Sequence, residues 1–398
     1  MHILSVHSRY QIRGGEDECH EAEVSLLREM GHFVEVYEEN NDRVAALGNL
    51  RMAVRTIWSE EAHQIVSRRL TEQPYDVVHV QNFFPLISPA VYHAAKAKGV
   101  PVVQTLHNYR LLCPNALFFR DGRVCEDCLG KPIPLPGVQH ACYRDSRAAT
   151  GVVSAMLSVH RAIHTWTDMV DVYIALTEFA RKKFIEGGLP AEKIRVKPNF
   201  VHPDPGIGEG RGGYALFVGR LSVEKGLDTL LAAWDIISGK IPLKIVGDGP
   251  LAGQVAEAAK RLPYVEWLGR KPMSEVHKLM GEASVLIFPS KWYETFGRVA
   301  IEAFAKGTPV IAANIGAIAE LIEHGRTGLH FRPGDPEDLT AKVEWILAHP
   351  AELAQMRREA RSEYEAKYTA EKNYRQLLEI YHQTRCPPAP LSLVEPAS

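Results

Sequence analysis

Short apolar runs alternate with amphipathic stretches along most of the chain. Val285–Pro289 (VLIFP) is one such run, and because it is short, apolar and closed by proline it suits a strand buried on both faces. A helical pattern follows from about residue 298 and stops at Gly307. The same strand-then-helix order recurs before and after this stretch, which is typical of parallel sheets covered by helices.

The alternation is interrupted by His202–Gly213 (HPDPGIGEGRGG), the strongest linker signal in the chain, and it starts again at Tyr214. Two consecutive blocks of this kind predict an α/β protein with two Rossmann-like, doubly wound parallel-sheet domains that face each other across a cleft. We expect the first domain over 1–201, a linker over 202–213, the second domain over 214–368 and a disordered, proline-rich tail over 386–398.

Candidate binding residues fall where predicted strands end. Ligands of parallel sheets bind at the carboxyl ends of the strands, and Gly14-Gly15, His107, Gly219-Arg220 and Glu294 all follow predicted strands. Neither GxGxxG nor GxxxxGK[ST] is present, so the sequence supports neither a dinucleotide fingerprint nor a P-loop.

Two cations stand in the loop Gly219–Gly226 (GRLSVEKG), after the first strand of the second block. Arg220 and Lys225 can reach one point from this loop, and two cations at a strand end fit a pyrophosphate. The alternative interpretation is an ordinary basic pair on the surface.

Two carboxylates, Glu294 and Glu302, flank the segment Thr295-Phe296-Gly297 at the start of a predicted helix. A helix start offers free N–H groups to an anion, and carboxylates accept hydrogen bonds from hydroxyls. A nucleotide sugar has hydroxyls on both sides of its pyrophosphate, so the arrangement suits that ligand. The alternative is a helix with two solvated glutamates.

Composition limits the partners and the compartment. The chain has 398 residues, 46% hydrophobic and 24% charged, with a formal net charge of -2, so a polyanionic partner such as nucleic acid is not indicated. There is no apolar run of transmembrane length. Six cysteines in a chain of this length predict the reducing cytoplasm and leave contact with a membrane surface open.

A cysteine-rich insertion occupies Cys113–Asp145. Cys125 and Cys128 form a CxxC pair, and with Cys113 and Cys142, or with His140 in place of a cysteine, they predict one tetrahedral structural zinc site. Buried thiols or a redox pair are the alternatives. A nucleic-acid-binding zinc ribbon is disfavoured because the segment is not basic.

With these motifs in order, the whole chain resembles the retaining glycosyltransferases of family four, which have the GT-B fold. The match rests on the Gly14-Gly15-Glu16 loop, His107, the Arg220 and Lys225 loop, and the Glu294–Glu302 segment. The N-terminal half resembles a subset that acts on bacterial surface polysaccharides. The resemblance also implies that a C-terminal helix, over 369–385, crosses back to the first domain.

The resemblance implies a role for each residue of the site. Arg220 and Lys225 would bind the donor diphosphate, and Glu302 would hold the ribose. Glu294 would contact the transferred sugar, His107 would lie near it, and Phe296 and Gly297 would offer backbone N–H groups. Gly14 and Gly15 would approach the pyrophosphate from the first domain. Many relatives have glycine where Thr295 stands, which puts the choice of sugar in question.

The implied reaction transfers a sugar from a UDP-sugar or from GDP-mannose to a glycan or lipid-linked acceptor, with retention at the anomeric carbon. No catalytic cofactor is expected, since an Asp-x-Asp metal motif is lacking. Two other functions stay open: a nucleotide-sugar epimerase of similar fold, and a nucleotide-sugar-binding regulator without transferase activity. A glycosidase would use two carboxylates but would leave Arg220 and Lys225 without a purpose.

Overall fold

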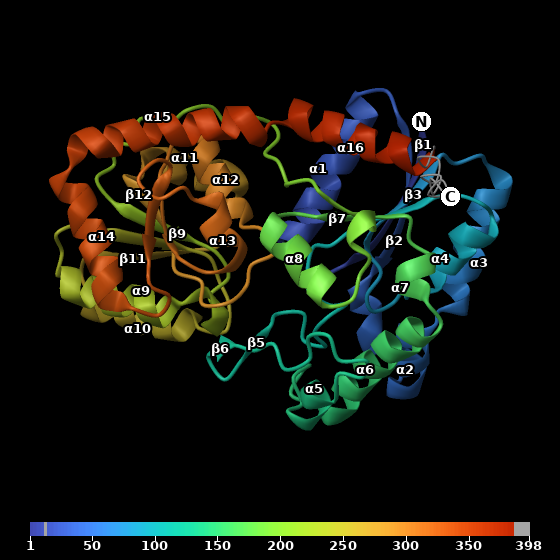
Figure 1. Cartoon of the computed structure of the whole chain (residues 1–398). Coiled ribbons are helices and arrows are strands. Elements are labelled where there is room, and N and C mark those ends of the chain that lie inside the picture. Colours follow the sequence, from blue (N-terminus) through green and yellow to red (C-terminus); the bar gives the residue numbers. More distant parts are fainter. Residues whose placement is uncertain (12–13, 386–398) are drawn as a thin grey trace, which may run out of the picture.

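Two parallel six-stranded sheets, each covered by helices, form the two halves of the protein (Figure 1). The structure is a computed structural model, and it describes residues 1–11 and 14–385. The predicted α/β class with two Rossmann-like domains is confirmed. The predicted tail 386–398 lies outside the described residues.

The first sheet has the strand order β2-β1-β3-β4-β7-β8. Its central strands are buried along their whole length, because helices cover both faces. Its strands are β1 (His2–Arg9), β2 (Phe33–Asn40), β3 (Val77–Asn82), β4 (Val102–Thr105), β7 (Val172–Ala175) and β8 (Ile194–Val196). The helices between them are α1 (Gly15–Glu29), η1 (Asn41–Ala46), α2 (Asn49–Ile57), α3 (Glu60–Glu72), α4 (Ala90–Ala97), α6 (Arg147–Ala162), α7 (Thr165–Asp168), α8 (Glu178–Glu186) and η2 (Ala191–Lys193).

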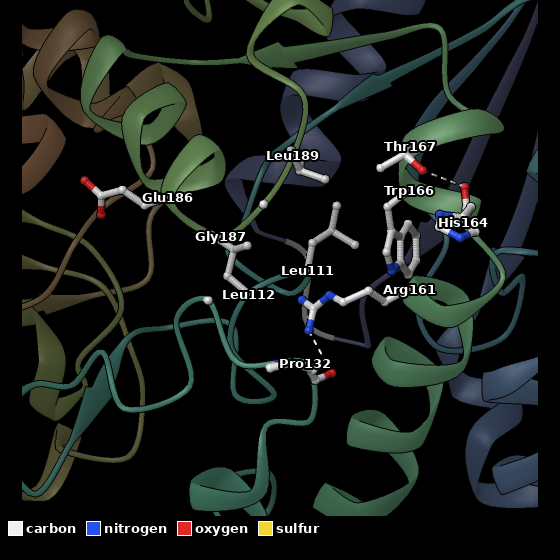
Figure 2. A pocket seen from close by; sticks show the side chains of 12 residues that line it. Leu111, Leu112, Pro132, Arg161, His164, Trp166, Thr167, Glu186, Gly187 and Leu189 are labelled. Carbon is white, nitrogen blue, oxygen red and sulfur yellow. Dashed lines mark hydrogen bonds between the residues drawn. The ribbon is translucent and has the colours of Figure 1, made fainter.

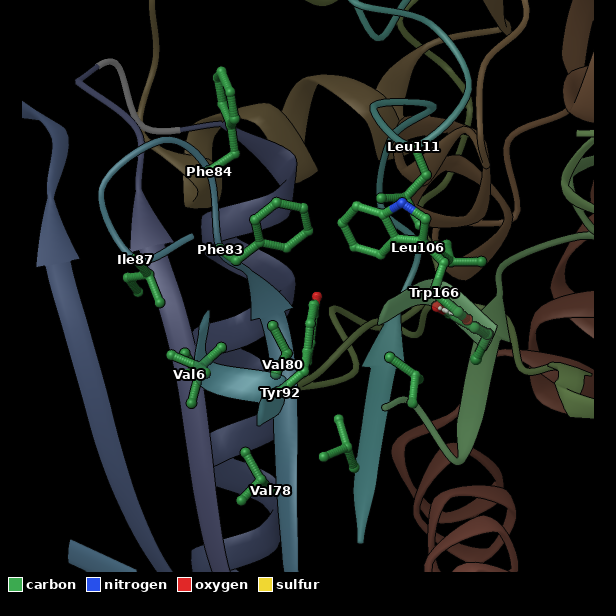
Figure 3. Packing of buried hydrophobic residues seen from close by; sticks show 14 of the residues in the cluster. Val6, Val78, Val80, Phe83, Phe84, Ile87, Tyr92, Leu106, Leu111 and Trp166 are labelled. Atoms are coloured by element: carbon green, nitrogen blue, oxygen red, sulfur yellow. Dashed lines mark hydrogen bonds between the residues drawn. The ribbon is translucent and has the colours of Figure 1, made fainter. Parts of the chain in front are cut away.

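The core of this domain lies between the sheet and the helices that follow β3 and β4. Val6, Val78 and Val80 of the strands face Tyr92 of α4 and Trp166 of α7 (Figure 3). The cysteine-rich insertion lies below this core in Figure 1 and contributes a small hairpin, β5 (Phe119–Arg120) with β6 (Arg123–Val124), and the short helix α5 (Leu135–Gln139). These elements have no counterpart among the sequence predictions.

The second sheet has the order β11-β10-β9-β12-β13-β14, the doubly wound order in which the chain reverses beside its first strand. Its strands are β9 (Ala215–Val218), β10 (Leu243–Val246), β11 (Val265–Gly269), β12 (Val285–Phe288), β13 (Val310–Ala313) and β14 (Gly328–Phe331). Its helices are η3 (Val223–Lys225), α9 (Leu227–Ile237), α10 (Ala252–Arg261), α11 (Met273–Glu282), α12 (Arg298–Ala305), α13 (Gly316–Leu321), α14 (Pro336–Ala348) and α15 (Pro350–Lys367).

The charged C-terminal stretch consists of two helices. α15 ends at Lys367, and α16 (Ala370–Arg385) begins after a break at Tyr368 and Thr369. Figure 1 shows α15 along the second domain and α16 continuing over the first. Leu377, Ile380 and Tyr381 of α16 pack in one cluster with residues of the first sheet. Within residues 1–11 and 14–385, no helix is both long and apolar enough to span a bilayer.

Candidate functional site

Three loops meet at the carboxyl ends of β9, β10 and β12, and glycines let their backbones touch. A Cβ at Gly226 would lie 1.9 Å from the carbonyl oxygen of Pro289, and Gly226 has a φ of 70°. A Cβ at Gly247 would lie 1.9 Å from the carbonyl oxygen of Gly219. Both positions therefore need glycine. The close approach brings the Arg220 and Lys225 loop against the loop that carries Glu294.

Glu294 accepts three hydrogen bonds on one carboxylate oxygen. Its Oε1 lies 2.6 Å from Lys225 Nζ, 2.8 Å from Ser290 Oγ and 2.9 Å from Trp292 Nε1. The residue is 7% exposed, so the interpretation as a solvated surface glutamate is wrong for this position. Three donors in a dry site hold the carboxylate in one orientation.

The two predicted cations differ in their surroundings. The Lys225 ammonium also lies 5.4 Å from the ring centroid of Trp292, which keeps it beside Glu294. Arg220 is exposed, and within the described part of the chain its side chain makes no hydrogen bond or ion pair. A guanidinium without such a partner, in the same loop as a fixed ammonium, is suited to a doubly charged oxyanion.

Phe296 and Gly297 lead into α12. Among the described residues, no group accepts a hydrogen bond from the backbone N–H of either residue. Gly297 has a φ of 123° and caps the helix. The Phe296 ring is buried and packs against Tyr368. Two free amides therefore stand at the positive end of α12, where an anion is favoured.

Glu302 is 1% exposed on α12, so the solvated alternative is wrong here too. Its Oε1 lies 2.9 Å from Arg298 Nε, one helical turn earlier, although the two groups lack the geometry of a hydrogen bond. Burial raises the pKa of Glu302 to about 7, even though the Arg298 guanidinium acts to lower it. A carboxyl poised near neutrality and lacking a hydrogen bond can accept one from a ligand hydroxyl.

The two domains touch directly at these residues. Thr295 Oγ1 donates to the backbone oxygen of His107 at 2.8 Å. The hydroxyl of Tyr109 donates to the backbone oxygen of Glu294 at 3.2 Å. Arg298 Nη1 forms an ion pair with Glu18 at 2.9 Å. The structure thus brings His107 and the Glu294 loop together.

Gly14 and Gly15 stand at the start of α1. The amide of Gly14 donates to Asp17 Oδ2 at 3.0 Å, and Asp17 in turn pairs with His7 at 2.8 Å. Among the described residues, a Cβ on either glycine would meet nothing within 4 Å. The first turn carries the acids Glu16, Asp17 and Glu18.

His107 follows β4 and is held from behind. Its Nε2 lies 2.7 Å from Gln81 Oε1. Burial lowers the pKa of His107 to about 3, so its imidazole is neutral at physiological pH. A neutral imidazole offers one donor and one acceptor.

Cys113, Cys125, Cys128 and Cys142 form no disulfide among the described residues, and the other three thiols lie close enough to Cys128 to act on its charge. Burial raises the pKa of Cys128 to about 12, and the other three thiols add to the rise. In the part of the chain that the structure describes, no three His, Cys, Asp or Glu side chains are placed to hold a metal ion. Zinc therefore stays a prediction, and so does the choice between Cys142 and His140.

A separate pocket of about 210 Å³ lies in the first domain, between the insertion and the end of α8 (Figure 2). Arg161 lines it and donates to the backbone oxygen of Pro132 at 2.8 Å, and Trp166 and Leu189 also line the pocket (Figure 2). None of the residues predicted for the site lines this pocket.

Sequence reasoning missed four residues of the site. Ser290 and Trp292 flank Glu294 in its own loop, where a donor-rich loop around a carboxylate was the available signal. Arg298 stands four residues before Glu302, the spacing of a helical ion pair. Tyr109 carried no signal, because its contact with Glu294 joins the two domains.

Two family models match successive parts of the chain. The model described as "Glycosyltransferase Family 4" matches residues 23–205, and the one described as "Glycosyl transferases group 1" matches residues 207–363. The boundary between the two matches falls inside the predicted linker. The candidate residues from Arg220 to Glu302 lie in the second match, and His107 lies in the first.

Individual relatives agree with these matches. An uncharacterised glycosyltransferase, MJ1178 of Methanocaldococcus jannaschii, is 32% identical over 187 residues, which are 46% of this chain and 52% of the relative. The D-rhamnosyltransferase WbpZ of Pseudomonas aeruginosa is 34% identical over 162 residues, 39% of this chain and 42% of that one. The matched region thus spans about half of these relatives' length.

Similarity of fold extends further than similarity of sequence. The crystal structure of Anabaena Alr3699/HepE in complex with UDP and glucose superposes with a TM-score of 0.70 at 19% identity, over 96% of this chain and 100% of that one. At this identity the likeness shows the two-domain fold and nothing finer.

Proposed function

We propose that the chain is a two-domain (GT-B) glycosyltransferase of the retaining type, which transfers a sugar from a nucleoside diphosphate donor to a glycan or lipid-linked acceptor. The two family-model matches, over residues 23–205 and 207–363, support the transferase assignment. The observation that carries the proposal is the grouping at one sheet edge: an unpaired Arg220, a fixed Lys225 and the free amides at the start of α12. Such a group suits a diphosphate that becomes more negative as it leaves.

In the proposed reaction the bond between the anomeric carbon and the diphosphate oxygen breaks, and its electron pair leaves with the diphosphate. Arg220, Lys225 and the α12 amides stabilise that charge. An acceptor hydroxyl attacks from the same face, and its proton passes to an oxygen of the departing diphosphate. Glu302 holds the ribose, and Glu294, fixed by its three donors, accepts from hydroxyls of the sugar. No metal is assigned a step.

The acceptor class and the setting are further parts of the proposal. The N-terminal half resembles enzymes that act on bacterial surface polysaccharides, so such a polysaccharide is the first acceptor class to test. Alr3699/HepE was crystallised with UDP and glucose, which makes UDP-glucose the first donor to try, with GDP-mannose next. We place the reaction in the cytoplasm, at the inner face of the membrane if the acceptor is lipid-linked.

The test is nucleoside diphosphate release from a panel of UDP- and GDP-sugars, with and without glycan acceptors. A transferase releases diphosphate in an acceptor-dependent way. An epimerase changes the sugar without an acceptor, and a binding regulator releases nothing. We expect Arg220→Ala to slow release by about 100-fold, since one such group contributes roughly 3 kcal/mol. The matched control is Arg211→Ala, an exposed linker arginine whose one ion pair within the described residues is with Glu209 at 3.6 Å. Equal rates for the two variants would contradict the diphosphate assignment.

A further inference from the structure

A hydrogen-bonded network of buried polar side chains extends from His107 into the first domain. Gln81, in β3, is 4% exposed. Its Oε1 lies 2.7 Å from His107 Nε2, and its Nε2 donates to Glu23 Oε1 at 2.6 Å. Glu23 comes from α1, so the network joins the helix that follows the Gly14-Gly15 loop to His107, after β4.

Lys197, which is 2% exposed, keeps Glu23 ionised. Its Nζ lies 3.1 Å from Glu23 Oε2. Burial alone would raise the pKa of Glu23, but the charge and hydrogen bond of Lys197, together with His79 and His107, outweigh burial and bring the pKa to about 2. His79 also faces this carboxylate, at 3.3 Å, and acts in the same direction. Glu23 is therefore a hydrogen-bond acceptor only.

An acceptor at Glu23 fixes the direction of every bond as far as His107. The Gln81 amide nitrogen must face the carboxylate, so the Gln81 oxygen must face the imidazole. An amide oxygen only accepts, and consequently the His107 proton is on Nε2. Nδ1 then carries the lone pair. Within residues 1–11 and 14–385, Nδ1 has no hydrogen-bond partner and is not among the buried orphan atoms.

We propose that Gln81 is a positioning residue that locks His107 in the Nε2–H tautomer, so that Nδ1 accepts a hydrogen bond from a hydroxyl of the transferred sugar. The proposal rests on the proposed function for its ligand, but the tautomer itself does not. His107 lies on the correct side of the site, because its backbone oxygen accepts from Thr295 beside Glu294. A fixed neutral acceptor selects a sugar with a hydroxyl at that point.

Residues of α16 hold the end of this network that lies away from His107. Lys197 Nζ also lies 3.1 Å from Asn373 Oδ1, and Asn373 Nδ2 donates to the backbone oxygen of Pro198 at 2.7 Å. The hydroxyl oxygen of Tyr381, in α16, lies 2.7 Å from His79 Nδ1. The helix that joins the domains thus also supports the residues that orient His107. The titratable groups of this network are Glu23 of α1, His79 of β3, His107 after β4, Lys197 after β8 and Tyr381 of α16. Three of these groups, Glu23, His79 and His107, also act on His20 of α1.

The direct test is long-range proton–nitrogen NMR of the full chain labelled with ¹⁵N-histidine, with His107→Gln to assign the signal. We expect one neutral His107 imidazole, protonated on Nε2, that does not titrate between pH 6 and pH 8. A proton on Nδ1, or an imidazolium in that range, would overturn the proposal. This measurement on the unmodified protein needs no variant to fold and no substrate.

The variant Gln81→Met keeps the volume and removes the acceptor. We expect His107 to populate both tautomers, and we expect kcat/KM for transfer to fall roughly three- to tenfold, the range for a lost neutral hydrogen bond. The control is Gln104→Met. Gln104 is equally buried in the neighbouring strand β4, and its Oε1 has no hydrogen-bond partner among residues 1–11 and 14–385. It should leave the tautomer and turnover unchanged.

The outcomes separate the two proposals. If Gln81→Met lowers only the melting temperature and keeps the Nε2–H tautomer and turnover, Gln81 is merely structural and the inference fails. If no nucleotide sugar is turned over but the Nε2–H tautomer is found, the network is correct and the proposed function fails. If transfer occurs with an Nδ1–H imidazole, the function stands and this inference is wrong.

Discussion

Lys225 is the residue whose loss separates catalysis from stability most clearly. Its ammonium lies 2.6 Å from Glu294 Oε1 and against the Trp292 ring, and its side chain is 22% exposed. The variant Lys225→Met keeps the apolar stem and removes the charge. It leaves Glu294 with two donors, Ser290 and Trp292.

Two magnitudes follow from this geometry. Removing one preorganised cation from a developing oxyanion costs roughly 3 kcal/mol, which lowers kcat by about 100-fold. Losing one charged hydrogen bond in a partly exposed site costs about 1.5–3 kcal/mol of unfolding free energy at most, since Glu294 stays hydrogen-bonded. We therefore expect a melting temperature within a few degrees of the wild type.

The assay is the initial rate of nucleoside diphosphate release at saturating donor, together with a thermal melt of each variant. The matched control is Lys240→Met in the same domain. Lys240 is 59% exposed, and in the part of the chain that the structure describes it pairs with Glu344 alone. Lys225→Arg, which restores a cation, should recover part of the rate. A kcat for Lys225→Met within threefold of the wild type, with the protein folded, would refute the role of Lys225 at the diphosphate.

Three further predictions follow from the site. The pKa of Glu302 is raised to about 7, so the carboxylate that accepts from the ribose forms only as pH rises through neutrality. KM for the donor should therefore fall between pH 6 and pH 8. Glu302→Gln should show a flat pH profile of KM, and an unchanged slope in that variant would rule out the assignment. Thr295→Val removes the 2.8 Å hydrogen bond to the His107 backbone oxygen, and we expect donor preference across a sugar panel to change more than the melting temperature. The stability control is Thr308→Val, which removes a hydrogen bond outside the site, from the Thr308 hydroxyl to the Met280 backbone oxygen at 2.6 Å. If the four thiols of the insertion bind zinc, the purified protein should contain close to one equivalent by elemental analysis and lose it in Cys128→Ser; a metal-free protein with all thiols titratable would favour buried thiols.

The positions of the site residues could be predicted because strand ends in a parallel sheet lie on one edge. Arg220, Lys225 and Glu294 were found by that rule, although 69 residues separate Lys225 from Glu294. The direct bond between Lys225 and Glu294 could not be predicted, since it depends on Gly226 meeting Pro289 backbone to backbone. Spacing also could not tell a buried Glu302 from a solvated one.

The side-chain contacts between the domains could not be predicted from the sequence either, because they depend on how separate segments pack in the folded protein. The Tyr109 bond to Glu294 depends on how the insertion turns after β4, and no period or motif encodes that turn. The break between α15 and α16 falls at Tyr368-Thr369, without glycine or proline. It is set by Val201, whose amide donates to the Tyr368 backbone oxygen at 3.1 Å, and by packing of α16 on the first sheet.

The claim that the diphosphate lies between Arg220, Lys225 and the start of α12 is tested most directly by a crystal structure with a nucleoside diphosphate bound. We predict phosphate oxygens within hydrogen-bond distance of the Arg220 guanidinium, the Lys225 ammonium and the Gly297 amide, with the ribose on Glu302. A diphosphate bound away from both cations would contradict the account.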